Sequence, residues 1–294
     1  MTINTLRYNE IFPEEFSIRH KITEMTEKKT FHLHRQLEII FALSDNLKCQ
    51  FENEIVDIPQ YGMILLDQMN LHYIFRGKDS GVCDRYVLYF SSNYISNLST
   101  PEVNLLECFL LSQKKKKYVL SIPPESRPGF LSLLEQMDAF QNNEDPTAAS
   151  SFGWSLHTKF LLGQFLLLTN QRYIEQYGAE ANAMRTLHSN LVYRIYDFIE
   201  KYYQEELNTE GIAKNFGISK TQLYYIFKEV SGMTVSDYIT EYRITRAKEL
   251  LINSSYSVEI VSQETGYGNL SSFSRIFKAK TGMSPLQYRK RHAT

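Results

Sequence analysis

The sequence of 294 residues has few cysteines, a single tryptophan and no hydrophobic run long enough to cross a bilayer. Cys49, Cys83 and Cys108 are too few and too scattered for a disulfide framework or a CxxC metal site, so we expect reduced thiols and a cytoplasmic protein. The most apolar stretch, KFLLGQFLLLTN at 159–170, falls well short of the roughly 20 apolar residues that a transmembrane helix needs. The N-terminus has acids and no apolar run, which argues against a signal peptide. We therefore expect no membrane partner.

Motifs of the common enzyme classes are also missing. The sequence has no nucleophile elbow, no glycine-rich loop that cradles phosphate and no HExxH zinc motif. We therefore expect no enzyme, no catalytic residue and no cofactor.

Acidic residues are absent after Glu264. Residues 186–294 carry 14 Lys and Arg against 11 Asp and Glu, whereas residues 1–185 carry 18 against 22. The final thirty residues hold only basic charges, namely Arg275, Lys278, Lys280, Arg289, Lys290 and Arg291. Such an end is typical of a surface that binds a polyanion. A second basic run, KKKK at 114–117, is expected to be a solvated face at the end of a helix.

Three regions follow one another along the chain. From about 30 to 95, short apolar or alternating runs such as LEIIFAL, GMILLD and RYVLYFS predict an all-β sandwich or barrel. From about 101 to 180, FLSLLEQMDAF and WSLHTKFLLGQFLLLTNQRYIEQY carry apolar residues at helical spacing. From about 186 onward the whole pattern is helical.

A short helical phrase occurs twice in the last third of the chain, with an offset of fifty residues. The matching pairs are Phe227–Lys228 with Phe277–Lys278, Gly232–Met233 with Gly282–Met283, and Tyr238 with Tyr288. Each copy reads as a short helix, a glycine-containing turn and a second helix, which is the helix-turn-helix order. We place these two reading heads at about 209–231 and 258–281. The unbroken stretch at about 234–253 predicts a helix that connects them and holds them at a fixed separation.

The second helix of each copy has an apolar face for the core and a polar outer face. Hydroxyl, guanidinium and ammonium groups on one outer face suit the base edges and phosphates of a DNA major groove, which admits a helix. The candidate DNA-binding residues are Ser219, Lys220, Thr221, Tyr224, Tyr225 and Lys228 in the first copy, and Asn269, Ser271, Ser274, Arg275 and Lys278 in the second. Ser219 and Asn269 are also the expected N-caps of the two helices.

Residues 188–292 resemble the DNA-binding domain of the AraC/XylS family of bacterial transcription regulators. The resemblance rests on IAKNFGIS, LYYIFKEVSGMTVSDYI, YRITRAKELL and VSQETGYGNLSSFSRIFKAKTGMSPLQYRK. Tyr267, Asn269 and Ser262 depart from the residues that the family usually has there, which are Phe, Asp and Ala. Tyr225 stands where several members carry a base-reading Arg, so we do not expect the DNA target to carry over.

The phrase HLHRQLEI places His32, His34 and Glu38 so that all three would share one face of a strand. With His72, they resemble the metal-binding signature of cupin barrels, which holds Zn²⁺, Fe²⁺, Mn²⁺ or Ni²⁺. Three interpretations stay open, because these residues could line an effector pocket, hold a metal, or be purely structural. With Arg35, the candidate effector-binding residues are His32, His34, Glu38 and His72; Tyr61, Tyr73 and Arg85 are neighbours that would suit a sugar.

The fold class that follows is α+β. The family resemblance implies a cupin-like effector-sensing β-barrel at 1–100, a helical linker and dimerisation region at 101–183, and an all-α DNA-binding domain at 184–294. The expected function is a sequence-specific DNA-binding regulator, an activator that responds to a sugar or related metabolite. Its expected partners are double-stranded DNA, a second copy of the chain and, for an activator, RNA polymerase. The alternative is a metal-dependent cupin enzyme or metal-responsive sensor fused to a DNA-binding domain.

Overall fold

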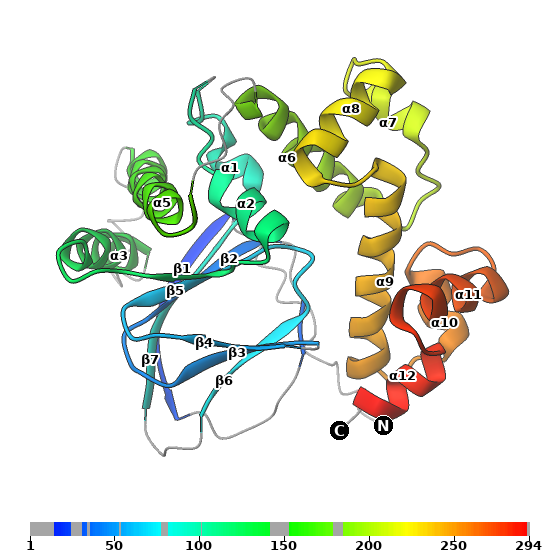
Figure 1. The fold of residues 1–294 in the computed structure, drawn as a ribbon, viewed down its shortest axis with the longest axis horizontal. Helices are drawn as coiled ribbons and strands as arrows, with labels where there is room; N and C mark the ends of the chain where they lie inside the picture. The colour runs from blue at the N-terminus through cyan, green and yellow to red at the C-terminus, as the bar shows by residue number, and fades with distance from the viewer. Residues whose placement is uncertain are drawn as a thin grey trace.

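The computed structural model describes residues 15–24, 31–33, 36–52, 54–77, 82–100, 102–141, 153–178 and 185–292. Figure 1 shows a β-sandwich, a layer of helices over one of its faces, and a C-terminal helical domain beside it. This arrangement is the mixed class of helices and antiparallel sheet that the sequence predicts. Within the described residues, no helix is both long enough and apolar enough to cross a membrane.

Two antiparallel sheets form the sandwich. The larger sheet has the spatial order β1 (Phe16–Glu24), β7 (Val82–Phe90), β2 (Leu37–Ala42), β5 (Gly62–Leu66) and β8 (Val119–Ser121). The smaller sheet has the order β4 (Ile55–Ile58), β3 (Leu47–Phe51) and β6 (His72–Arg76). A closed cupin barrel is not confirmed, because the described strands pair within two separate sheets that pack face to face.

Alternation along β2 explains how the larger sheet is covered on both faces. Ile39 and Phe41 belong to the hydrophobic cluster on the helix-covered face, whereas Ile40 and Ala42 belong to the cluster between the two sheets. Successive side chains of a strand point to opposite faces, so a fully apolar strand such as β2 serves two cores. Glu38 has the same parity as Ile40 and therefore faces the space between the sheets.

Four helices cover the outer face of the larger sheet: α1 (Ser92–Ser96), α2 (Glu107–Lys115), α3 (Arg127–Gln141) and α5 (Trp154–Tyr177). Their apolar residues join those of β2, β5 and β7 in one cluster. β8 lies within the segment that the sequence suggests is helical, and it adds a strand to the sheet beside β5.

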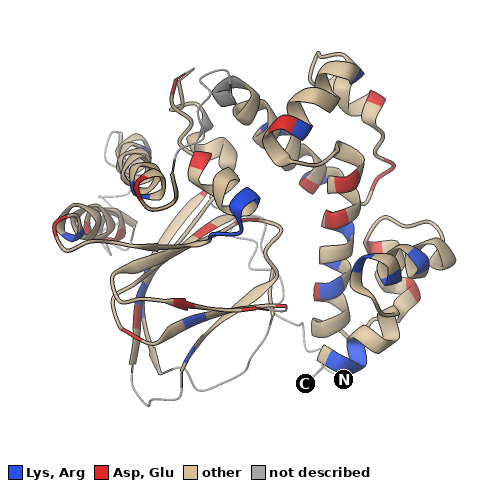
Figure 2. Ribbon diagram, viewed as in Figure 1, with Lys and Arg blue, Asp and Glu red and all other residues tan. Residues whose placement is uncertain are grey.

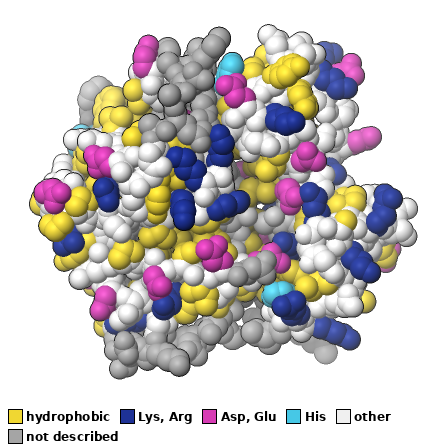
Figure 3. Space-filling view, viewed as in Figure 1, with side chains coloured by type: hydrophobic (Ala, Val, Ile, Leu, Met, Phe, Trp, Pro, Cys, Tyr) yellow, Lys and Arg dark blue, Asp and Glu magenta, His cyan; other side chains and the backbone are white. Residues whose placement is uncertain are grey.

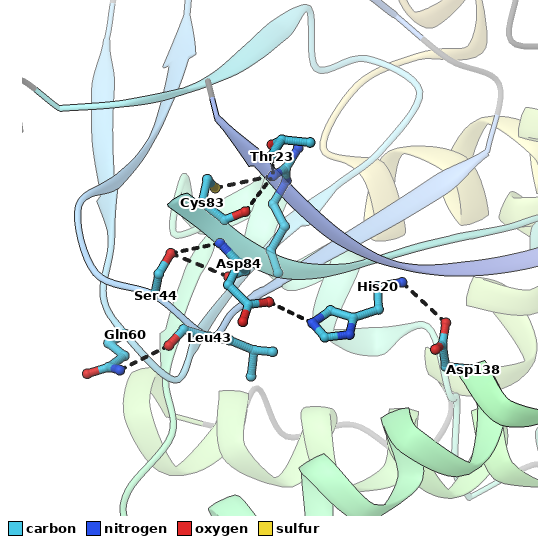
Figure 4. Close-up of polar contacts among 9 residues, drawn as sticks. His20, Thr23, Leu43, Ser44, Gln60, Cys83, Asp84 and Asp138 are labelled. Carbon is cyan, nitrogen blue, oxygen red and sulfur yellow. Dashed lines mark hydrogen bonds and ion pairs between the residues drawn. The ribbon is translucent and has the colours of Figure 1, made fainter. Parts of the chain in front are cut away.

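Polar side chains fasten β1 and β7 to their neighbours (Figure 4). His20 on β1 places Nε2 2.6 Å from Asp84 Oδ1 on β7, and the His20 backbone N–H donates to Asp138 on α3 over 3.2 Å. The backbone N–H of Asp84 donates in turn to the Ser44 hydroxyl over 3.0 Å. These bonds hold the sheet edge, the β2–β3 turn and α3 together.

The C-terminal helices are α6 (Arg185–Tyr202), α7 (Thr209–Asn215), α8 (Lys220–Ser231), α9 (Val235–Asn253), α10 (Val258–Glu264), α11 (Leu270–Thr281) and α12 (Pro285–His292). The first reading head, α7–α8, packs its Leu223, Phe227 and Val230 into the cluster that also covers the large sheet. The second reading head, α10–α11, has a separate cluster around Phe273 and Phe277.

Helix α6 attaches the first reading head to α1 and α2. The Tyr193 hydroxyl donates to the Leu106 carbonyl over 3.1 Å, and the Ser92 hydroxyl donates to Asp197 over 2.5 Å. Burial raises the pKa of Asp197 to about 6, partly offset by the bond from Ser92. The contact between α1 and α6 therefore includes a part-buried hydrogen bond.

Two arginines perform the same task in the two halves of the domain. Arg243 on α9 donates to the carbonyls of Tyr203 and Glu205, over 2.8 and 2.7 Å, in the turn between α6 and α7. Arg289 on α12 donates to the carbonyls of Leu251 and Tyr256, over 3.0 and 2.6 Å, between α9 and α10. Each guanidinium thus satisfies carbonyls at a helix end and ties a later helix to an earlier turn.

The turn between α10 and α11 meets the turn between α6 and α7 at Gly266. Gly266 has a φ of 78°, and a Cβ built on it would lie 2.6 Å from the Tyr203 carbonyl oxygen and 3.1 Å from Arg243 Cζ. The Gln204 side chain donates to the Glu264 carbonyl over 2.8 Å at the same junction. Only glycine allows both the positive φ and this close approach, which sets one reading head against the other.

We predict that Gly266→Ala destabilises the protein more than Gly282→Ala. Gly282 has the same φ of 78° but nothing within 4 Å of its built Cβ, so its substitution should cost only the left-handed strain, roughly 1–2 kcal/mol. The clash at Gly266 should add about 1–3 kcal/mol. Urea unfolding of both variants checks this, and equal losses would show that Tyr203 moves aside freely.

Candidate nucleic-acid interface and buried histidine cluster

Helix α8 begins with a complete capping box. The Ser219 hydroxyl accepts the backbone N–H of Gln222 over 3.1 Å, and the Gln222 side chain accepts the Ser219 N–H over 3.0 Å. The predicted N-cap is therefore present. Leu223 and Phe227 are buried, whereas the candidate DNA-binding residues of this helix, Ser219, Lys220, Thr221, Tyr224, Tyr225 and Lys228, are all exposed.

The outer face of α8 is aromatic and carries two positive charges, Lys220 at its start and Lys228 further along. Tyr225 is 67% exposed, and its ring meets that of Tyr224 edge-on at 5.4 Å. Lys228 Nζ donates to the Tyr224 hydroxyl over 3.1 Å, and this hydrogen bond raises the pKa of the ammonium. Tyr224 therefore holds Lys228 in place, while Tyr225 projects alone into solvent.

Helix α11 repeats the arrangement with a more basic outer face. Asn269 caps the helix by accepting the backbone N–H groups of Ser271 and Ser272, over 2.8 and 3.1 Å. Phe273 and Phe277 are buried, Ser274 is half-buried, and Ser271, Arg275 and Lys278 are exposed. Four candidates of the second head, Ser271, Ser274, Arg275 and Lys278, thus share one face of α11, and Asn269 caps its start. Their contact with DNA stays a prediction.

Two of the six basic residues near the C-terminus are occupied elsewhere in the fold. Lys280 Nζ lies 2.5 Å from Glu241 Oε1 on α9, so the expectation that no acid opposes this end of the chain is wrong. Arg289 is bound to the carbonyls described above. Figure 2 shows the remaining basic positions along α11 and α12, opposite the acids of α9 and α10. Pairing across helices is invisible to a count along the sequence.

A buried cluster of His32, Glu38 and His72 lies between the sheets. One side-chain ligand atom from each lies within 4.8 Å of the others, and His72 Nε2 is 3.1 Å from Glu38 Oε2. The sequence interpretation of one strand through His32 and Glu38 is wrong. β2 begins at Leu37, and His32 instead forms an isolated antiparallel bridge with His72. His34 and Arg35 lie outside the described residues.

The environment of His72 defines its tautomer. His72 Nδ1 lies 2.7 Å from the Asn70 carbonyl oxygen, which can only accept, so Nδ1 carries a proton and Nε2 faces Glu38. Burial, and then the charge of Glu38, raise the pKa of the nearby Cys49 thiol. Among the described residues, one carboxylate and two imidazoles therefore lie close together beside the apolar side chains between the sheets.

Of the three other residues expected near the pocket, Tyr73 lies beside the histidine cluster, Tyr61 does not, and Arg85 makes buried contacts of its own. Arg85 is buried and donates to the Thr23 hydroxyl and Cys83 Sγ, over 3.1 and 3.2 Å (Figure 4). Tyr73 packs edge-on against Phe31, at 4.8 Å between centroids, beside the cluster. Tyr61 is on the helix-covered side instead, with Arg127 4.4 Å above its ring, so it does not belong to this site.

Helix α9 docks on the rim of the sandwich beside the cluster. Lys248 Nζ lies 2.5 Å from Glu52 Oε2, and the Asn253 amide donates to the Phe31 carbonyl over 2.5 Å. Phe31 precedes His32, and the rim also includes Asn70, which holds His72. The helix that connects the reading heads therefore touches the same short segments that position the histidines.

A cavity of about 240 Å³ lies at this dock. Its lining residues are Phe51, Glu52, Glu54, Met69, Asn70, Leu71, Tyr118, Thr245 and Lys248. Carboxylate, amide, hydroxyl and ammonium groups beside apolar side chains can bind a small polar molecule through hydrogen bonds. Asn70 joins this cavity to the histidine cluster.

The sequence did not indicate Lys248, Asn253, Arg243 or Gly266 as site residues. Lys248 and Asn253 contact the sandwich across more than 190 positions, and no local pattern marks such a contact. Gly266 had a usable signal, because glycine closes the same turn in each copy of the repeat.

Comparison with known proteins bears on the C-terminal half. Residues 212–291 match the family described as "Helix-turn-helix domain". The Msm operon regulatory protein of Streptococcus mutans is 32% identical over 111 residues, which are 38% of this chain and 39% of that relative. The "Probable transcriptional regulator LumQ" of Photobacterium leiognathi is 22% identical over 268 residues, which are 91% of this chain and 95% of that relative.

Among solved structures, ToxT of Vibrio cholerae O395 gives a TM-score of 0.47 at 14% identity, over 95% of this chain and 98% of that one. The matched residues 212–291 begin within α7 and end within α12. They therefore include α9 and nearly all of both helix-turn-helix units. Residues 212–291 are therefore a helix-turn-helix domain, and this domain is similar to that of AraC-type transcription regulators.

Proposed function

We propose that this protein is a transcription regulator that binds double-stranded DNA through α8 and α11. The observation that carries the proposal is the pair of capped helices with exposed polar faces, set against each other at Gly266 and joined by α9. Two such helices on one rigid unit suit successive major grooves, as two half-sites do for paired single heads. The names of the relatives, which are regulators, support the same conclusion and speak against an enzyme.

The two heads differ in what they offer to DNA. Arg275 and Lys278 on α11 supply guanidinium and ammonium groups, which suit guanine edges and phosphates. Tyr224 and Tyr225 on α8 supply aromatic surface and hydroxyls, with Lys228 as the charge beside them. We assign target preference that is particular to this chain to α8, because Tyr225 is the most exposed of the large hydrophobic side chains in either head.

The sandwich is proposed to sense a small molecule and to pass its state to α9. The support is the shared rim, where Phe31, Glu52 and Asn70 contact α9 or its cavity and also adjoin the histidine cluster. A ligand shifts DNA binding only if its affinity differs between the docked and undocked states of α9. The polar groups of the cavity suit a sugar or related metabolite.

A homodimer through α5 completes the proposal. Phe160, Leu167 and Ile174 recur every seven residues along α5 and are each exposed by more than two fifths, at 55%, 48% and 41%. This spacing is that of a coiled-coil seam. When the α5 helices of two copies pair antiparallel about Leu167, Lys159 of one copy lies beside Glu175 of the other. The two-fold axis then repeats this contact on its other side. Activation of transcription, with RNA polymerase as a partner, is the proposed outcome.

A second candidate is a metal-responsive sensor, favoured by the geometry of His72. Its Nδ1–H is held by a backbone carbonyl, which is the usual outer contact of a metal-binding histidine, and its Nε2 points at Glu38. With His32, the donor set of two imidazoles and one carboxylate fits Zn²⁺, Fe²⁺, Mn²⁺ or Ni²⁺. A bound cation would connect β2, β6 and residues 31–33 to one another. This cross-link would make the rim beneath α9 more rigid.

The DNA-binding proposal predicts different losses for two variants of α11. Arg275→Ala should weaken binding to a duplex recovered by in vitro selection by about 1–3 kcal/mol, with little change on random DNA, because a base contact is lost. Lys278→Ala should weaken binding to both duplexes and reduce the salt dependence by about 0.9, because a phosphate contact is lost. Equal losses on both duplexes for Arg275→Ala would reduce its role to phosphate contact.

The sensing proposal predicts that DNA alters the sandwich, because coupling between two sites is reciprocal. Adding the selected duplex should change amide hydrogen exchange at residues 31–33 and 69–72 in the unaltered protein. The double variant Lys248→Met, Asn253→Ala should abolish this change. Lys48→Met is the matched control, since Lys48 also pairs with an acid, Asp57, but does so within the small sheet. No change on adding DNA to the unaltered protein would contradict the coupling.

The metal candidate predicts one site per chain that depends on the cluster. Titration of the purified protein with Zn²⁺ or Ni²⁺ should show one tight equivalent, lost in His72→Ala and in Glu38→Gln. His20→Ala is the control, because His20 also faces a carboxylate, Asp84, but lies on the edge strand β1 and outside the cluster. Binding that survives in His72→Ala would eliminate this candidate and leave the DNA-binding proposal untouched.

A further inference from the structure

The basic run at 114–117 lies beside the first reading head. It forms the end of α2 and the turn after it, and α2 packs against α8. In the view of Figure 3, Lys and Arg side chains gather over the C-terminal end of α2 and also appear over α8, α11 and α12. A segment far from the helix-turn-helix domain in sequence thus presents its charge on the face that also carries charges of both heads.

The backbone of this turn is held in place. Lys116 adopts the left-handed conformation, with φ 54° and ψ 42°, and the backbone N–H groups of Lys116 and Lys117 both donate to the Ser112 carbonyl. Lys115 Nζ donates to the carbonyls of Tyr177 and Gly178, over 3.0 and 2.9 Å, at the end of α5. Lys115 therefore has a structural task, and it anchors the three lysines around it.

The other three lysines, Lys114, Lys116 and Lys117, are exposed. Favourable interaction with the dipole of α2 accounts for a basic residue in the last turn, such as Lys114. It does not account for Lys116 and Lys117, because they lie beyond the helix. The like charges of Lys116 and Lys117 on this fixed turn repel one another, and a polyanion beside the surface relieves that repulsion.

Distances between packed elements indicate which polyanion. Packed helices lie about 8–10 Å apart, and the major groove of DNA is about 12 Å wide. Side chains at the end of an element that packs against a helix lying in the groove can therefore reach the groove edge, where the phosphates are. We propose that Lys114, Lys116 and Lys117 contact the DNA backbone beside the half-site that α8 enters. This inference rests on the proposed DNA-binding function and makes the sensing half of the chain part of the DNA interface.

The test is the full-length triple variant Lys114→Gln, Lys116→Gln, Lys117→Gln. Its affinity is measured by fluorescence anisotropy over a series of NaCl concentrations, on the selected duplex and on a random-sequence duplex. Each lost phosphate contact lowers the slope of log affinity against log salt by about 0.9, so the total should fall by roughly 2–3. Affinity should fall by about tenfold or more, equally on both duplexes, because phosphates carry no sequence information.

Three further variants keep the test decisive. The triple Lys→Arg variant at the same positions should retain the slope, because the charges remain. The single variant Lys117→Gln, beyond the helix end, should lower the slope by about 0.9 without disturbing α2. The control Arg19→Gln, Lys21→Gln, Lys48→Gln removes equal charge from β1 and β3, away from α8, and should leave the slope unchanged.

The outcomes separate this inference from the function beneath it. Failure of the unaltered protein to bind either duplex would overturn both. Binding by the unaltered protein, with the same slope in the triple Gln variant, would overturn the inference alone. An unchanged slope together with reduced activation in a purified transcription assay would also overturn it, and would assign the turn to an acidic protein surface.

Discussion

The hydrophobic core on the outer face of the large sheet continues without a break into the first reading head. Leu88 of β7, Phe109 of α2, Tyr196 of α6 and Phe227 of α8 all belong to the same cluster of buried residues. Because protein interiors are close-packed, the layers of such a core cannot slide freely past one another. The first head is therefore built onto the N-terminal half of the chain, whereas the second has its own core around Phe273.

The second attachment between the halves has a different character. At the rim of the sandwich, Lys248 and Asn253 of α9 hold Glu52 and the Phe31 carbonyl through polar contacts. Partly exposed ion pairs contribute little net free energy, so such contacts open at small cost while the shared core stays closed. Arg243 and Gly266 keep the heads in register with each other.

How far the sequence predicts this protein depends on how local each feature is. The N-caps Ser219 and Asn269 and the buried faces of α8 and α11 follow from residues within a turn or two of one another. The strand proposed through His32 and Glu38 was wrong because nothing local shows that His32 pairs with His72. The three cluster residues nevertheless meet, since β2, β6 and the segment at 31–33 converge between the sheets.

The sequence by itself determined the repeat, the helices that it forms and the side chains on their outer faces, because helical periodicity and capping are properties of neighbouring residues. Only the tertiary structure decided what each charge does. The fold pairs Lys280 with Glu241, directs the Arg289 guanidinium to backbone carbonyls and brings the lysines of 114–117 beside α8. The physical reason is that a charge acts through its nearest partners in space, and those partners here lie 33 residues or more away along the chain.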